Sequence, residues 1–209
     1  MKVTSFISHA FAAVAFAVPS GKGSSSQGTA QLATFDDLTA VPALSQINPV
    51  GTYKGLKYRS LNVLQVGVLG AAQVAGLKPQ SGSQVAANSI TGTVLTGAPS
   101  ISVASPYKSF DLQSLYFGCA VNSAASAVGV PQQCTIAFTA YLPGSSVAYQ
   151  TINQQFNPSN AVLSTLTKAT FPKSWTKMGK VAISIVQSTT TSPLTALFID
   201  NVHYTLYSK

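Results

Sequence analysis

Acidic side chains are scarce in this sequence of 209 residues. It contains four aspartates and no glutamate, against twelve lysines and arginines, so its formal net charge is +8. Charged residues make up only 8% of the chain, whereas about 25% is typical of soluble domains. A glycosidase that relies on a pair of glutamates is therefore excluded, and only four carboxylates could replace them.

Histidine and cysteine are just as rare. The chain has two histidines, His9 and His203, and two cysteines, Cys119 and Cys134. A zinc site built from clustered His and Cys ligands is excluded on this count. If a leader carries His9 away, His203 is the only imidazole left for acid–base catalysis. We therefore predict a non-catalytic protein.

The first residues have the pattern of a secretory signal peptide. In residues 1–17 an early lysine precedes a weakly apolar run that ends in Ala15-Phe16-Ala17, a small-residue cleavage motif. This run is shorter than the roughly 20 apolar residues that a membrane span needs, and we predict no span elsewhere. Residues 18–31 are rich in Gly, Ser and Gln, which is typical of a flexible linker. We expect a secreted, extracellular protein whose folded domain covers residues 32–209.

Secretion favours a disulfide bond between Cys119 and Cys134, because thiols oxidise outside the cell. Two separate buried thiols are the alternative. A catalytic thiol would have only His203 as a partner.

Apolar residues alternate with polar ones along much of the chain, which is typical of β-strands. In Cys134–Leu142, for example, Ile136, Phe138 and Ala140 fall on one face. The predicted strands are 56–66, 83–87, 89–96, 100–104, 110–121, 134–142, 146–156, 163–171, 180–187 and 195–207. About ten short strands separated by turns predict an all-β fold, a single β-sandwich of the jelly-roll type with antiparallel strands.

Two groups of aspartates stand on strands that look buried. Strand alternation places Asp37 on the side of Phe35, and Asp200 on the side of Phe198. An unpaired buried carboxylate costs several kcal/mol, so a hard divalent cation such as Ca²⁺ is one way to compensate it. The first and last strands of a sandwich commonly lie side by side, which would bring Asp36 or Asp37 to Asp200. The alternative is an Asx-turn at the first pair and backbone N–H donors at Asp200.

Four motifs follow one another along the chain: 34–38 (TFDDL), 81–88 (SGSQVAAN), 110–117 (FDLQSLYF) and 198–202 (FIDNV). Together they resemble secreted galactose-binding-like jelly rolls, a group that includes many carbohydrate-binding modules of bacteria and fungi. The resemblance implies a structural Ca²⁺ ion that ties the first strand to the last. It implies Asp36 or Asp37 and Asp200 as side-chain ligands, with carbonyl groups near Ser81 and Gly82, and a fungal source.

Sugars commonly stack on aromatic rings. Our candidates for ligand contact are Tyr107, Tyr141, Tyr149 and above all Trp175, which lies in a polar, basic stretch. Core filling is the alternative for each tyrosine, and packing over the end of the sandwich is the alternative for Trp175. Basic residues form two groups, at 54–59 and 168–180. No nucleic-acid motif accompanies them, so an acidic wall polysaccharide or plain solubilisation explains them better.

Three functions are compatible with these features. The first is a secreted, non-catalytic carbohydrate-binding protein whose partner is a glycan such as a cell-wall polysaccharide. The second is an effector or elicitor that a host protein recognises. The third is a polysaccharide hydrolase or lyase, which would have to use Asp111, Asp200 or His203.

Overall fold

The computed structural model describes residues 27–40, 48–66, 75–88, 97–121, 129–188 and 195–208. The predicted signal peptide and the predicted strand 89–96 lie outside these residues. All regular structure in the described part is β-strand, and none of it forms a helix of the length and hydrophobicity that a membrane span requires. The strands are β1 (Thr29–Ala33), β2 (Pro49–Tyr53), β3 (Leu56–Gln65), β4 (Gly76–Lys78), β5 (Gln84–Asn88), β6 (Ser100–Val103), β7 (Ser109–Val121), β8 (Cys134–Tyr141), β9 (Ala148–Phe156), β10 (Leu163–Thr165), β11 (Thr167–Thr170), β12 (Lys180–Ser188) and β13 (Thr195–Tyr207).

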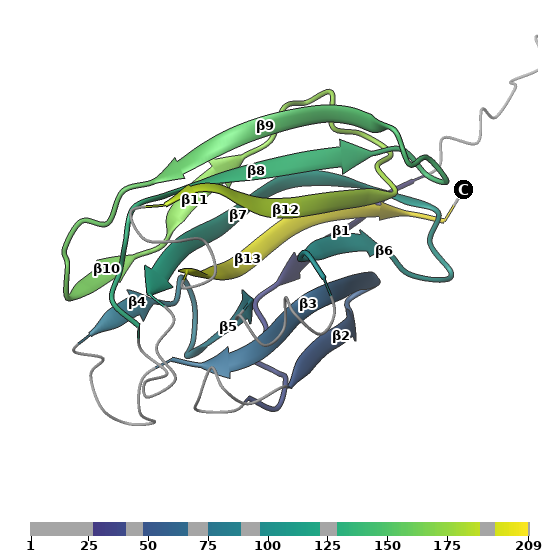
Figure 1. Ribbon diagram of the computed structural model, residues 1–209. Coiled ribbons are helices and arrows are strands. Elements are labelled where there is room, and N and C mark those ends of the chain that lie inside the picture. The colour runs from purple at the N-terminus through teal and green to yellow at the C-terminus, as the bar shows by residue number, and fades with distance from the viewer. Residues whose placement is uncertain are drawn as a thin grey trace, which may run out of the picture.

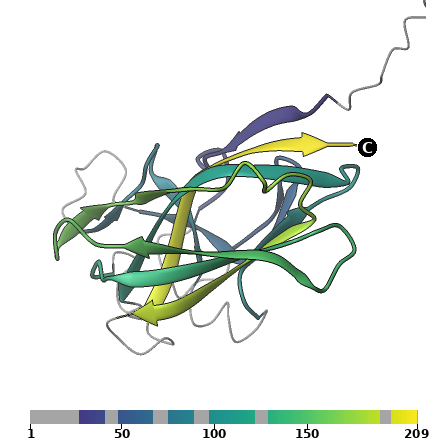
Figure 2. The ribbon, with the colours of Figure 1, turned by 90° about the horizontal axis from the view of Figure 1, so that it is seen from above.

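One large sheet contains eleven of these strands, in the order β11-β7-β13-β5-β3-β6-β12-β8-β9, with β1 paired to β13 and β2 paired to β3. The pairings within it are antiparallel, and the short strands β4 and β10 form a separate parallel pair. The sheet curls so that β8 and β9 lie above β3 and β5 (Figure 1), and seen from above it almost closes on itself (Figure 2). The predicted all-β sandwich is confirmed.

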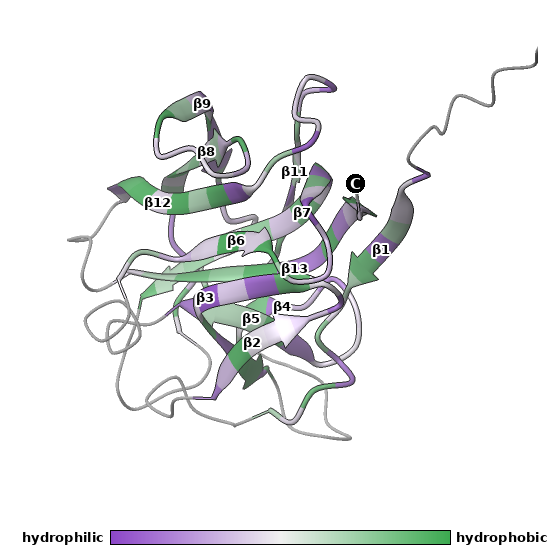
Figure 3. Cartoon of the chain, turned by 90° about the vertical axis from the view of Figure 1, so that its right-hand side faces the viewer, coloured by the Kyte–Doolittle hydropathy of each residue, from purple (hydrophilic) through white to green (hydrophobic). Residues whose placement is uncertain are grey.

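The core fills the inside of this curl. Strands carry alternating hydrophilic and hydrophobic bands (Figure 3), because successive side chains point to opposite faces of a sheet. Phe117 of β7 meets Phe138 of β8 edge-to-face, with ring centroids 5.9 Å apart, and Phe156 of β9 at 6.4 Å. Each of these rings is 0% exposed. These contacts hold the two ends of the sheet together.

The predicted disulfide is confirmed, with Cys119 of β7 bonded to Cys134 of β8. These two strands are not hydrogen-bonded neighbours in the sheet order. The bond therefore spans the curl and joins its two walls.

The N-terminal boundary of the domain lies slightly earlier than expected. Strand β1 begins at Thr29, before the predicted boundary at residue 32, and pairs along its whole length with β13 from Leu206 to Val202. The first and last strands of the described chain are thus neighbours, as the metal hypothesis required.

Candidate functional site

Two carboxylates from opposite ends of the chain converge on one loop, residues 79–83, between β4 and β5. Asp200 lies on β13 and is 0% exposed, and its Oδ2 accepts hydrogen bonds from the backbone N–H groups of Gln80 (2.8 Å) and Ser81 (3.1 Å). Asp36 lies in the turn after β1, and its Oδ1 accepts from the N–H groups of Ser83 (3.0 Å) and Gln84 (3.2 Å). The loop is thereby tied to both the first and the last strand.

Ser81 stands at the centre of this cluster. Its Oγ lies 3.1 Å from Asp36 Oδ2 and 2.7 Å from Asn201 Oδ1. A hydroxyl group has one proton to donate, so it can serve only one of these two acceptors at a time. Rotating the Asn201 amide by 180° would turn its NH₂ group toward Ser81, so that Ser81 Oγ could accept from Asn201 and donate to Asp36 without a cation. A cation shared by the oxygens would satisfy them equally well.

Asp37 does not join the cluster, which corrects the expectation from strand alternation. Strand β1 ends at Ala33, and the chain turns back at Phe35, where the N–H of Leu38 donates to the Phe35 carbonyl at 3.1 Å. The turn breaks the two-residue period, so Asp36 points to the loop and Asp37 is exposed. Asp37 accepts a hydrogen bond from Tyr53 Oη, which lowers the pKa of this carboxyl.

Gly82 provides the space into which the Asp36 carboxylate fits. A Cβ atom on Gly82 would lie 2.0 Å from Asp36 Oδ1 and 2.3 Å from its Cγ. The residue also has a φ of +50°, in the left-handed region that favours glycine. Glycine is therefore required here for two reasons, the backbone angle and the close approach of Asp36.

Burial raises the pKa of Asp200 to about 7, and the nearby charge of Asp36 adds to this rise, while the N–H donors of Ser81, Asn201 and Gln80 oppose it. This agrees with a carboxyl that lacks a basic partner. The donor set, two carboxylates with a hydroxyl and an amide oxygen, is of the type that Ca²⁺ takes. No cluster of three His, Cys, Asp or Glu side chains occurs among the residues described. The calcium site at Asp36 and Asp200 stays a prediction.

The aromatic candidates differ from one another in accessibility. Trp175 is 1% exposed, its ring stacks on Phe171 at 5.0 Å, and its Nε1 donates to Gln150 Oε1 at 2.7 Å. It is a core residue and offers no surface to a ligand, so the prediction of ligand contact at Trp175 is corrected to a packing role. Tyr107 is half-buried and packs against the core. Of the four, Tyr149 is the most accessible, at 48% exposed.

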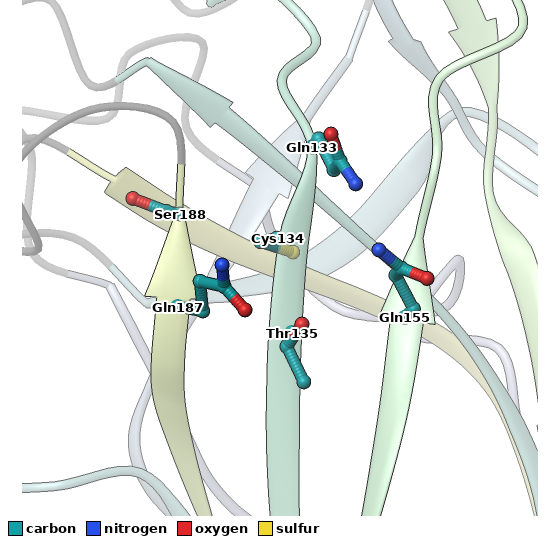
Figure 4. Close-up of a pocket in the computed structure, with 6 residues that line it drawn as sticks. All are labelled: Gln133, Cys134, Thr135, Gln155, Gln187 and Ser188. Carbon is teal, nitrogen blue, oxygen red and sulfur yellow. The ribbon is translucent and has the colours of Figure 1, made fainter.

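A pocket that the sequence did not predict lies on the outer side of β8, β9 and β12. It has a volume of about 220 Å³ and is lined by Gln133, Cys134, Thr135, Gln155, Gln187 and Ser188. Figure 4 shows the side chains of Gln187, Thr135 and Gln155 on three neighbouring strands. Thr135 of β8 lies opposite Gln155 of β9 on one side and opposite Gln187 of β12 on the other, so the three residues form one row across three strands. Because the cysteine here is in the disulfide, no lining side chain is titratable.

The row belongs to a larger surface, which we call the outer polar face. Its further rows follow from the antiparallel registers, in which directly opposed residues point to the same side. The rows are Asn153–Ala137–Ser184, then Thr151–Thr139–Ala182–Ser100–Arg59, then Tyr141–Lys180–Ser102–Lys57. The residues between them on β8, Ile136, Phe138 and Ala140, are 0% exposed and face the core. Tyr141 thus lies on this face.

No protein-family model matches this sequence, and no curated protein matches it either. The fold is similar to that of a DUF4465 family protein from Bacteroides caccae, with a TM-score of 0.53 and 7% identity over 84% of this chain and 98% of that one. A cyclase from Fischerella sp. TAU aligns over 86% of this chain and 98% of its own, with 12% identity and a TM-score of 0.44. The first likeness shows a shared fold alone.

Proposed function

We propose that this protein is a secreted, non-catalytic binder of polysaccharide, and that the pocket of Gln133, Thr135, Gln155, Gln187 and Ser188 holds one sugar unit of the polymer. The proposal agrees with the resemblance to galactose-binding-like modules in the sequence. The observation that carries it is the chemistry of the pocket, where three amides and two hydroxyls line one concave surface.

Amides and hydroxyls suit sugars for a physical reason. Each glutamine offers two donors and a carbonyl acceptor, and each hydroxyl can donate and accept, which matches the donor and acceptor character of sugar hydroxyls. With no titratable side chain in its lining, the pocket supplies hydrogen bonds and no acid or base. Its volume of about 220 Å³ is below the roughly 300 Å³ at which pockets for whole small molecules begin. A single unit of a longer chain fits this size better.

A calcium ion at Asp36, Ser81, Asp200 and Asn201 would have a structural role in this proposal. It would tie β1 and β13 to the loop at residues 79–83, and it would neutralise the two carboxylates when both are ionised. The cluster is not part of the pocket lining, so we expect chelation to reduce stability without removing a ligand contact.

Affinity electrophoresis and calorimetry with neutral soluble polysaccharides (xylan, mannan and mixed-linkage β-glucan) test the proposal. We expect at least one to bind the wild-type protein, and the double variant Gln155→Ala/Gln187→Ala to lose this binding. The matched control is Gln27→Ala/Gln80→Ala, because both are exposed glutamines outside the pocket. The proposal would be overturned if the wild-type protein bound none of the three polymers, or if both double variants bound equally well.

A protein partner is the alternative that one further observation favours. The hairpin between β8 and β9 exposes Leu142 (42%), Val147 (75%) and Tyr149 (48%). Neighbouring exposed apolar residues of this kind commonly mark contact sites. If Val147→Ser/Tyr149→Ser abolishes a response of host tissue while polysaccharide binding is absent, the effector hypothesis replaces the proposal.

A further inference from the structure

One lysine from each of the two basic groups of the sequence lies on the outer polar face. Lys57 of β3 and Lys180 of β12 stand 123 positions apart in the chain, yet both oppose Ser102 of β6 in the antiparallel registers. Lys180 in turn opposes Tyr141, and its Nζ lies 4.2 Å from the centroid of that ring. Lys57, Ser102, Lys180 and Tyr141 therefore form one row across four strands, which we call the basic row. Arg59 belongs to the next row of the same face.

None of the protein's four aspartates belongs to this face. Asp36 and Asp200 are held in the cluster around Ser81, and Asp37 accepts a bond from Tyr53. Asp111 accepts bonds from the N–H of Lys177 (2.7 Å) and from Tyr207 Oη (2.7 Å). Since the sequence has no glutamate, every carboxylate side chain of the protein is engaged elsewhere. The basic row has no internal acid to neutralise it.

Lys57 and Lys180 are also close enough to repel each other. They are separated by β6 alone, and two strand spacings of about 4.8 Å put their backbones roughly 10 Å apart. This is comparable with the Debye length of about 8 Å at physiological salt, so their charges are only partly screened. An anion placed between them would be attracted by both and would relieve the repulsion.

The basic row and the amide pocket lie on the same face of the sheet, toward opposite ends of β8. Along β8 the pocket row at Thr135 and the basic row at Tyr141 are six residues apart, which is about 20 Å at a rise of about 3.3 Å per residue. The rows between them carry Asn153, Ser184, Thr139 and Thr151. Small and polar groups thus line the stretch between the two rows, a length suited to a short run of sugar units.

We propose that the ligand is an acidic polysaccharide, which places one unit in the amide pocket and a carboxylate of a unit farther along between Lys57 and Lys180. This inference rests on the proposed function and adds the substrate class to it. Tyr141 holds the Lys180 ammonium in place by the contact of charge and ring. The acidic group decides which polymer binds, and the pocket supplies hydrogen bonds to any sugar.

Polygalacturonate and its fully methyl-esterified form test this inference, because the two differ in charge while sharing the same sugar backbone. We expect the wild type to bind the free acid about tenfold more tightly, the effect of two exposed ion pairs. The double variant Lys57→Gln/Lys180→Gln should bind both forms equally. The control Lys78→Gln/Lys168→Gln removes the same charge from exposed positions on β4 and β11, and it should keep the preference. Thermal melts of both variants verify the fold.

Three results would overturn the inference. One is equal binding of both polymer forms by the wild type. Another is a loss of preference in the control as large as in the Lys57/Lys180 variant, which would assign the effect to the net charge of +8. The third is tighter binding of dextran sulfate than of polygalacturonate, which would assign the row to sulfate groups. If neutral polysaccharides still need Gln155 and Gln187 in any of these cases, the proposed function stands while this inference fails.

Discussion

Substituting alanine for Gly82 should destabilise the protein far more than a glycine substitution normally does. The added Cβ would lie 2.0 Å from Asp36 Oδ1, 2.3 Å from Cγ and 2.6 Å from Oδ2. Non-bonded atoms do not approach so closely, so the Asp36 carboxylate must leave its position. The backbone N–H groups of Ser83 and Gln84 would then lose their shared acceptor.

The expected loss can be estimated from these contacts. A non-glycine residue at a φ of +50° costs about 1–2 kcal/mol. Losing a hydrogen bond to a charged group costs about 1.5–3 kcal/mol, and at least one such bond breaks. The free energy of unfolding of Gly82→Ala should therefore fall by about 3–5 kcal/mol, a large fraction of the roughly 5–15 kcal/mol that holds a domain together.

Urea denaturation of two glycine variants measures this effect. Gly51 has a φ of +65° with nothing within 4 Å of an added Cβ, so Gly51→Ala should show the backbone strain alone, about 1–2 kcal/mol. In the double variant Gly82→Ala/Asp36→Ala the two losses should not add, because the clash disappears with the carboxylate. If Gly82→Ala is no less stable than Gly51→Ala at equal m-value, the contact between this loop and Asp36 is refuted.

Two further predictions concern stability. Because the pKa of Asp200 is raised from 3.8 to about 7, the folded state binds this proton more tightly than the unfolded chain. Stability should therefore fall by up to about 4 kcal/mol between about pH 4 and pH 7. Asp200→Asn should flatten this dependence of stability on pH in denaturant titrations, and an unchanged dependence would contradict the role of Asp200. Ca²⁺ should stabilise the wild type most near pH 7, and a Tm that does not respond to a chelator would contradict the calcium site. Replacing both cysteines by alanine should lower stability by about 3 kcal/mol, because the bond closes a loop with a sequence separation of 15; an unchanged melting curve would show otherwise.

Long strands were predictable from the sequence because their burial is one-sided. The alternation in 134–142 and 180–187 matches β8 and β12 to within a residue, and 195–207 matches β13. Strands β1 and β2 were not predictable in this way because apolar and polar residues alternate little in either of them. Strand β1 takes its backbone partners from β13, and nothing local in its sequence signals that pairing.

The sequence predicted that aspartates from the two ends of the chain lie close together, but it did not predict which of Asp36 and Asp37 joins Asp200. The common adjacency of the first and last strands of a sandwich predicts that Asp36 or Asp37 lies close to Asp200, and Asp36 does. The loop at Ser81 was implied only by the family resemblance, as a source of carbonyl groups, whereas the structure brings in its N–H and hydroxyl. The prediction for Asp37 is wrong because the turn at Phe35, with a φ of 64°, ends the strand alternation before the aspartates. A positive φ at a phenylalanine carries no sequence signal.

The pocket and the burial of Trp175 could not be predicted for one shared reason. Gln155 and Gln187 become neighbours of Thr135 only through the pairing of β8 with β9 and β12. The register between strands that are far apart in the chain cannot be derived from the sequence alone. Trp175 looks accessible in the sequence because lysines surround it. Its indole is buried nonetheless, since Gln150 accepts its N–H and Phe171 covers its ring.

The positions of the four aspartates explain what the scarcity of acidic residues means for the surface of the protein. A surface rich in lysine usually neutralises itself with nearby carboxylates, and exposed pairs of that kind add little stability. Here the four carboxylates accept hydrogen bonds that tie turns and loops to strands, with Asp111 bonding the loop before β12 and Asp36 and Asp200 bonding the loop before β5. The basic row consequently keeps its charge for an external anion. Introducing a glutamate at Ser102, between Lys57 and Lys180, would supply the missing internal partner, and it should lower the affinity for an acidic polymer without changing the affinity for a neutral one.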